Sequence, residues 1–282
     1  MTPNRTFLPS TPEVLARYPA LAAAARRNQV WAAAWLIAAL ALTVFSFWSL
    51  GIAFGQIRSG LSQLGWLVAQ MFPPSTGSHF PLLLHAMGET LAIAFLGTLI
   101  AATMAFPVSF LAARNTTPGT VIHFLARRCF DTIRGVDVLI WALVFVGVVG
   151  LGPFAGILAI AVSDAGTFGK LFSETLETTD RKPIDGVLST GGSQLLAIRF
   201  ALIPQVLPVM LSQLLYYFES NVRNATIIGI VGAGGIGLQL SEQIRTYDFD
   251  QVAFVIIMIL VTVAAIDWVC GKLRFHVIGR ST

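Results

Sequence analysis

The residues best suited to chemistry in this 282-residue chain form a small polar group at positions 218–223. Glu219 and Arg223 are four residues apart, so on a helix they would share one face and could form an ion pair. Charge in an apolar segment is costly and usually functional. The pair is therefore either structural, holding a break in a helix, or part of a path on which Arg223 offers positive charge and a fork of donors to an anion.

A glycine-rich motif follows this group. Residues 232–237 read GAGGIG and match the G-x-G-x-x-G pattern of dinucleotide sites. That function needs a βαβ unit and an acidic residue about 20 positions later, but residues 255–260 are apolar. The glycines instead favour non-helical backbone within a membrane protein, a feature that points to a transport path. The chain has no G-x-x-x-x-G-K-[ST] motif, so we expect no ATP site of that kind.

The remaining polar residues in apolar surroundings give weaker signals. Asp137 and Asp164 stand at the edges of apolar runs, where they are interpreted as interfacial residues or helix caps. The alternative is a pair of carboxylates in a membrane-embedded enzyme. The four histidines and two cysteines are scattered, so no metal site is predicted. Neither H-E-x-x-H nor G-x-S-x-G occurs, and no catalytic residue is assigned.

Composition defines the elements that must position these groups. Hydrophobic residues make up 55% of the chain and charged residues 11%, and the mean hydropathy is +0.76. Soluble proteins carry about 25% charged residues. An ordinary soluble enzyme is therefore excluded, and the sequence predicts an all-α membrane protein.

Six apolar runs can be counted as transmembrane helices. Basic residues cluster before the first run, after the second, before the fifth and after the last, so every rich cluster falls on one side of the membrane. The positive-inside rule then places both termini in the cytoplasm. The group at 218–223 follows the fifth run and is expected deep in the membrane or near its outer face. The predicted spans are 30–54, 91–113, about 134–150, about 153–172, 200–218 and 252–266.

The spans divide the chain into regions with different expected roles. Residues 1–28 form a cytoplasmic tail or elbow, and residues 29–282 form the membrane domain. The glycine-rich segment at about 224–245 is not counted as a span, because its apolar run 225–240 has about 16 residues and a spanning helix needs about 20. The loop at about 180–199 is predicted to form two short helices around a glycine turn, and hence a docking knob on the cytoplasmic face.

This loop resembles the EAA loop of ABC importer permeases, whose pattern is Glu-Ala-Ala, three residues, Gly, nine residues and Ile-x-Leu-Pro. Asp185 takes the Glu position, Gly186 the first Ala position, Gly191 the Gly position and Pro204 the Pro position. The resemblance implies that two ATPase subunits dock here. The residues assigned to this coupling surface are Asp185, Gly186, Gly191, Gly192, Ser193, Arg199 and Pro204.

A second resemblance lies downstream. Residues 202–208, 218–226 and 231–237, with 150–156, resemble the permease of phosphonate-type ABC importers, the branch that takes phosphonate, phosphite or hypophosphite. The resemblance implies a type I importer permease with six transmembrane helices and cytoplasmic coupling helices. It also assigns a path or gate to the polar and glycine-rich block. These residues are Glu219, Ser220, Asn221, Arg223, Thr226, Gly232, Gly234, Gly235 and Gly237.

The same resemblance implies the partners. Two permeases, as a homodimer or with a paralogous permease, would form the pore in the bacterial inner membrane, and a periplasmic binding protein would deliver the ligand. ATP and Mg would be bound by the ATPase, and this chain would need no cofactor and bind no nucleic acid. The alternatives are a secondary transporter of a small anion and the membrane-embedded enzyme.

Overall fold

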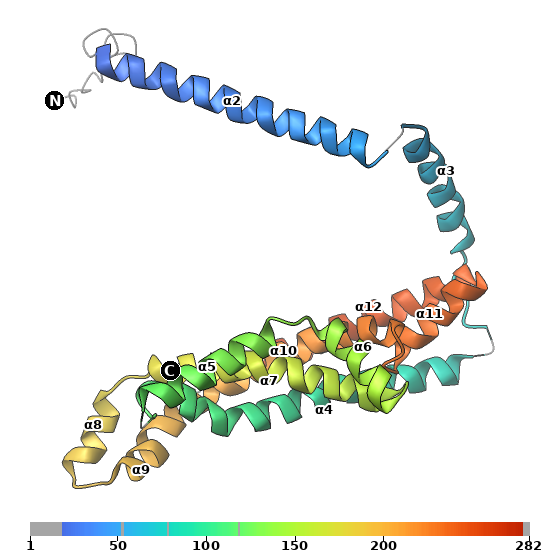
Figure 1. Cartoon of the computed structure of the whole chain (residues 1–282). Helices are drawn as coiled ribbons and strands as arrows, with labels where there is room; N and C mark the ends of the chain where they lie inside the picture. The colour runs from blue at the N-terminus through green and yellow to red at the C-terminus, as the bar shows by residue number, and fades with distance from the viewer. Residues whose placement is uncertain (1–18, 52–53, 78, 118, 279–282) are drawn as a thin grey trace, which may run out of the picture. The chain divides into compact units, whose positions relative to one another are not determined.

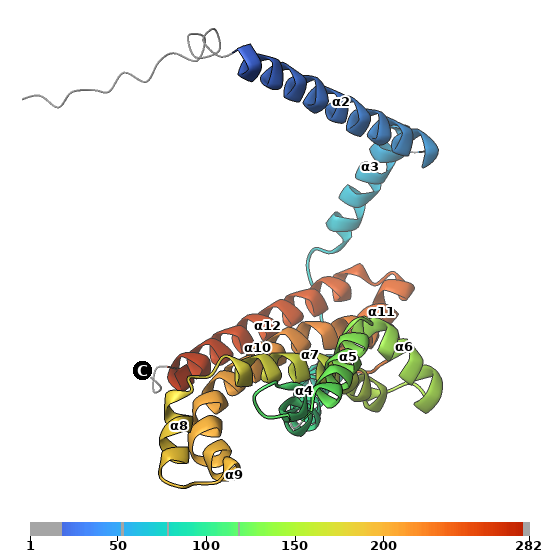
Figure 2. The same ribbon diagram turned by 60° about the vertical axis from the view of Figure 1, so that its left-hand side comes forward.

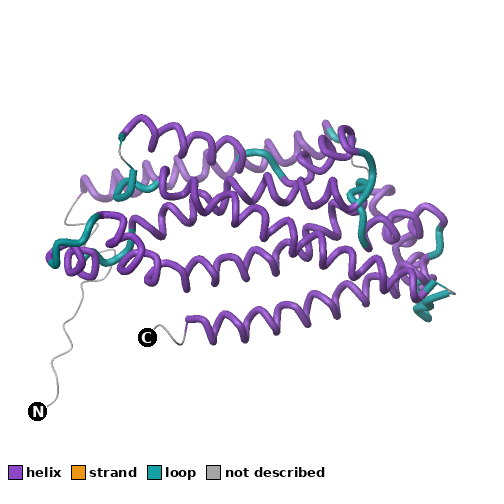
Figure 3. The backbone as a smooth tube through the Cα atoms, turned by 90° about the horizontal axis from the view of Figure 1, so that it is seen from below, coloured by secondary structure: helices purple, strands orange, loops and turns teal. Residues whose placement is uncertain are grey.

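The computed structural model describes residues 19–51, 54–77, 79–117 and 119–278, and every regular element in these ranges is a helix (Figure 3). The chain divides into two compact units, residues 1–67 and 68–282. In the described part of the chain, five helices are long and apolar enough to cross a membrane, and a bent pair of helices provides a sixth candidate. This agrees with the predicted six-span, all-α class.

The first unit contains α2 (Pro19–Ser49) and most of α3 (Phe54–Gln70). From Val30 onward the side chains of α2 are exposed, as expected of an apolar helix that lipid surrounds. Helix α3 was not predicted. Its apolar residues recur at helical spacing along one face, which is typical of an amphipathic helix. Of the predicted tail at 1–28, residues 1–18 lie outside the described residues.

The second unit is a helical bundle with α8 and α9 at one end and α11 towards the other (Figure 1). Helix α10 runs beside α12 along the bundle (Figure 2). The described helices of the second unit after α3 are α4 (Phe80–Ala112), α5 (Thr120–Arg134), α6 (Val138–Val149), α7 (Pro153–Glu177), α8 (Lys182–Ser189), α9 (Gln194–Ala197), the π-helical turn η1 (Ile198–Leu202), α10 (Ile203–Ile230), α11 (Ile236–Thr246) and α12 (Phe249–Ile278).

Small residues allow the bundle helices to approach closely. Helix α4 packs most extensively against α7, where Gly97 faces Ile160 so closely that a Cβ on the glycine would lie 2.7 Å from the isoleucine side chain. Without a hydrophobic driving force in lipid, such close packing is a main source of helix association. Three buried clusters follow one another along the bundle, around Phe168, Ile160 and Ile236.

The third predicted span differs from the structure. Helix α6 has 12 residues, so it is about 18 Å long and cannot cross a hydrocarbon core of about 30 Å alone. Helix α5 meets it at an angle of 83°. The bend is stabilised at Asp137, whose carboxylate accepts a hydrogen bond from the Leu139 N–H at 2.8 Å. The interpretation of Asp137 as a helix cap is confirmed.

The fifth predicted span differs from the structure too, because the helix is longer than predicted. Helix α10 continues without interruption through Glu219 and Arg223 to Ile230, and the break comes at residues 231–235. The interpretation that Glu219 and Arg223 hold a helix break is therefore wrong. No glycine or proline occurs between Pro208 and Gly229, so the backbone has no local reason to leave the helix at this point.

Candidate functional site

The predicted coupling loop folds as two short helices joined by a tight turn. Helix α8 ends at Ser189, and α9 begins after Ser193, whose hydroxyl accepts a hydrogen bond from the Leu196 N–H at 3.5 Å. Gly191 has a φ of +83°, a conformation that glycine adopts at little cost. Asp185, Gly186, Gly191 and Ser193 are exposed and Gly192 is half-buried, so most of the turn is available to a partner.

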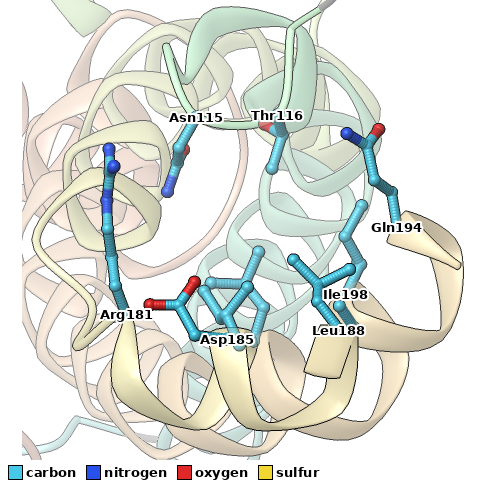
Figure 4. Close-up of a pocket in the computed structure, with 10 residues that line it drawn as sticks. Asn115, Thr116, Arg181, Asp185, Leu188, Gln194 and Ile198 are labelled. Carbon is cyan, nitrogen blue, oxygen red and sulfur yellow. The ribbon is translucent and has the colours of Figure 1, made fainter. Parts of the chain in front are cut away.

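A cavity of about 240 Å³ lies behind this loop (Figure 4). Asn115 and Thr116, from the turn after α4, face Arg181, the residue before α8, and Asp185 on α8, while Gln194 and Ile198 line the other side. Arg199 and Pro204 lie beyond it, where Arg199 is exposed over the Phe200 ring at 5.5 Å and Pro204 is in the first turn of α10.

Glu219 and Arg223 belong to a larger charged network that joins α10 to α12. Its strongest contact is between Glu219 and Arg274, at 2.8 Å. Arg223 is held less tightly, because it lies 4.0 Å from Glu219 and 3.7 Å from Asp267. Its side chain is 49% exposed, against 16% for Glu219. The charged network, defined as Glu219, Arg223, Asp267 and Arg274, holds two cations and two carboxylates.

The partners of the charged network indicate its depth. Asp267 and Arg274 follow the apolar run 252–266 of α12 and lie towards its C-terminal end. The charged network therefore lies beyond the apolar run of α12, on the side of its C-terminal end. The predicted pairing of Glu219 with Arg223 exists, but Arg274 is the closer partner.

A buried polar network lies beside the charged one and links three helices. The Asn221 amide on α10 donates to Thr98 Oγ1 on α4 at 2.9 Å and to the Asp164 carboxylate on α7. Asn224 in turn donates to Asn221 Oδ1 at 3.1 Å. Asn221 is 1% exposed and Asp164 is 8% exposed. Because Asp164 lies in the middle of α7, the interpretation of Asp164 as an interfacial residue or a helix cap is wrong. Asp137 and Asp164 thus have different partners, the Leu139 N–H for Asp137 and the Asn221 amide for Asp164.

The glycine-rich segment forms a turn that is enclosed by protein. Gly232, Gly234 and Gly235 have φ values of +98°, +83° and +75°. The Ile236 N–H at the start of α11 donates to Thr90 Oγ1 at 2.8 Å, and the Gly152 N–H from the turn between α6 and α7 donates to the Gly232 carbonyl at 2.9 Å. The glycine turn, residues 231–235, is therefore fixed to α4 and to a second glycine turn.

The other predicted path residues have mainly packing roles within one copy of the chain. Gly237 lies against Gly229, where the backbones of α10 and α11 nearly touch. Thr226 donates its hydroxyl to the Val222 carbonyl of the same helix at 3.3 Å, and Ser220 is half-buried. The structure thus brings Glu219, Asn221 and Arg223 together with residues that sequence reasoning missed. These are Thr98, Asp267 and Arg274, with Asp164 in a different role.

The family model described as "Binding-protein-dependent transport system inner membrane component" matches residues 105–275. The chain is 39% identical to a putative phosphite transport system permease protein, HtxC of Stutzerimonas stutzeri, over 90% of this chain and 89% of that protein. It is 34% identical to PtxC of the same organism, a phosphite transport system permease protein, over 78% of this chain and 80% of that protein.

Other relatives and solved structures extend the comparison. The phosphate-import permease protein PhnE of Mycolicibacterium smegmatis is 38% identical over 75% of this chain and 40% of that protein. An inward-facing structure of the MetNI methionine ABC transporter superposes with a TM-score of 0.63 at 20% identity, covering 72% of this chain and 99% of that one. The superposition on the methionine transporter shows that the two chains share a fold. The chain therefore belongs to the family of binding-protein-dependent transport system inner membrane components, the membrane-spanning permeases of ABC importers.

Proposed function

We propose that this permease forms the translocation path for phosphonate or for a reduced phosphorus oxyanion, phosphite or hypophosphite. The observation that carries the proposal is the 39% identity to a putative phosphite transport system permease across almost the whole of both chains. The test is uptake of labelled phosphite, hypophosphite, methylphosphonate and phosphate by cells that express the importer, together with calorimetry of its binding protein. Uptake of phosphate alone would overturn the proposal.

The proposed assembly has two copies of this chain, two ATPase subunits with ATP and Mg, and a periplasmic binding protein. Membership of the family supports the ATPase and the binding protein. A paralogous permease is the alternative to the homodimer, and Escherichia coli has two relatives of this chain, the putative cryptic phosphonate permeases PhnE1 and PhnE2. The positions of the arginines and lysines support cytoplasmic termini.

Within this assembly we assign the anion contact to Arg223. Its guanidinium is half exposed and its two carboxylate contacts are long, so it can turn towards an anion without breaking the 2.8 Å pair between Glu219 and Arg274. The glycine turn and α11 would position the surrounding backbone. Guanidinium groups bind phosphorus oxyanions through paired hydrogen bonds, which ammonium groups cannot reproduce.

Arg223→Ala is expected to lower uptake by about tenfold or more, because a hydrogen bond to a charged group is worth about 1.5–3 kcal/mol. Arg223→Lys keeps the charge but loses the fork and should recover part of the uptake. The ATPase should still co-purify with both variants. Normal uptake by Arg223→Ala would remove Arg223 from the path.

The α8–α9 loop is our candidate for ATPase coupling. Gly191→Val places a β-branched side chain at a φ of +83°, which is strongly disfavoured, so the turn must change shape. We expect the ATPase rate that the loaded binding protein stimulates to fall at least about fivefold, in line with about 1–3 kcal/mol of backbone strain. Thr190→Val, one residue earlier at a φ of −82°, is the matched control. An unchanged stimulated rate in Gly191→Val would contradict the assignment.

A further inference from the structure

We propose that a basic cavity beside α5 binds a phosphate group carried by an anionic phospholipid. The cavity lies between α5, the turn after α4 and Lys170 on α7, and its volume is about 330 Å³. A second hollow of about 400 Å³ shares Arg114, Thr120 and His123 with it. We call the first of these the α5 cavity; its charged and titratable lining consists of Arg114, His123, Arg127, Arg128, Asp131 and Lys170.

Positive charge is in excess at the α5 cavity. Asp131 is shared by Lys170 at 2.8 Å and Arg128 at 3.5 Å, so one carboxylate faces two cations. Arg127 is paired with Glu177 at 2.8 Å. Four cations therefore face two carboxylates, and the excess is two positive charges. Basic cavities between membrane helices on the cytoplasmic side are suited to the head groups of anionic lipids.

Two of these cations are held only by long contacts, since Arg128 lies 3.5 Å from Asp131 and Arg114 lies 3.5 Å from His123. The side chain of Arg114 makes one described contact, from Nε to His123 Nε2 at 3.5 Å, while its backbone N–H donates to Glu177 at 2.8 Å. The side chain of Arg128 is 65% exposed and lies over the Phe124 ring at 5.2 Å. Both guanidinium groups can therefore present donors to phosphate oxygens without breaking the Arg127 or Lys170 ion pairs.

The surface next to the cavity favours a lipid as the source of the phosphate. Val121, Ile122, Phe124 and Leu125 on α5 are 72%, 44%, 56% and 61% exposed. Phe124 also lines the α5 cavity, so the apolar strip and the basic lining meet at this residue. A phospholipid would place its phosphate among the arginines and its acyl chains on the strip. Free phosphate would use only the arginines.

The same end of the bundle holds the predicted coupling loop, because Asn115 and Thr116, directly after Arg114, line the cavity behind α8. The proposed lipid site therefore lies on the side of the membrane where basic residues gather. A phospholipid at this position would anchor α5 next to the turn that supports the coupling loop.

The test uses the full chain purified with its ATPase. Native mass spectrometry would count retained phosphatidylglycerol and phosphatidylcholine, and thermal unfolding would be followed while phosphatidylglycerol, phosphatidylcholine or inorganic phosphate is added. We expect phosphatidylglycerol to be retained in preference to phosphatidylcholine. Its apparent affinity should fall about tenfold in Arg114→Gln/Arg128→Gln, because this variant removes two basic residues that would attract the anionic head group.

The matched control removes two exposed arginines from other helices, Arg58→Gln on α3 and Arg245→Gln on α11, and should retain phosphatidylglycerol as the wild type does. Equal retention by the cavity variant and the wild type would overturn the proposal. Loss of the ATPase from the cavity variant with unchanged lipid retention would overturn it in favour of a protein contact. Stabilisation by inorganic phosphate equal to that by phosphatidylglycerol would overturn the lipid source.

Discussion

Gly237→Ala is expected to prevent the segment after α10 from packing and thereby to abolish uptake. A Cβ at position 237 would overlap the Thr226 carbonyl oxygen and lie 2.9 Å from Gly229 Cα. Both obstacles are backbone atoms of α10, so no side chain can rotate to make room. Overpacking that forces the backbone to move costs about 1–3 kcal/mol and occasionally more, and this site is at the upper end because both obstacles are backbone. The thermal unfolding midpoint of the purified permease, the amount of folded protein in the membrane and the rate of uptake should all decrease.

Gly271→Ala is the matched control for this prediction. Gly271 lies inside α12, and a Cβ there would meet no heavy atom within 4 Å. Because alanine is the better helix former by about 1 kcal/mol, the control should be as stable as the wild type or slightly more stable. If Gly237→Ala transported and unfolded like Gly271→Ala, the close approach of α10 and α11 would not be required for function.

The elements that could be predicted from the sequence are those with a local cause. Apolar runs define spanning helices because lipid demands them, and this holds for α2, α4, α7, α10 and α12. The turn at Gly150 and Gly152 was predicted from a local cause too, because glycine and proline residues favour turns. In the structure both glycines have positive φ values. Helix α5 was missed because its arginines are typical of a cytoplasmic loop, although its apolar residues recur at helical spacing.

The candidate site was only partly predictable because its contacts join distant parts of the chain. Arg274 lies 55 residues from Glu219 and was counted among the basic residues of the C-terminal tail. Asn221 lies 57 residues from Asp164 and 123 from Thr98. Which of these side chains meet depends on the register of α4, α7, α10 and α12, and the spacing of polar residues within one helix carries no information about that register. The pair of Glu219 and Arg223 at i and i+4 was predicted, but Arg274, the closer partner of Glu219, was not.

The second large effect is expected at Arg274. Arg274→Met leaves Glu219, which is 16% exposed, with only the 4.0 Å contact to Arg223. Removing one partner of a fully buried ion pair costs about 3–5 kcal/mol, and this pair is partly buried, so we expect a cost of about 1–3 kcal/mol. We therefore expect a marked decrease in the thermal unfolding midpoint of the purified permease. A midpoint equal to that of the wild type would show that Glu219 does not depend on Arg274.

The double variant Glu219→Leu/Arg274→Met separates a structural role of Glu219 from a role in transport. Replacing both members of such a partly buried pair with apolar residues is expected to be close to neutral for stability, and Arg223 keeps Asp267 at 3.7 Å. The unfolding midpoint should therefore return close to that of the wild type. If the pair only holds α10 against α12, uptake will recover together with stability. If Glu219 sets the position of Arg223 on the path, as we expect, stability will recover while uptake stays low, because Arg223 will then be held by Asp267 alone.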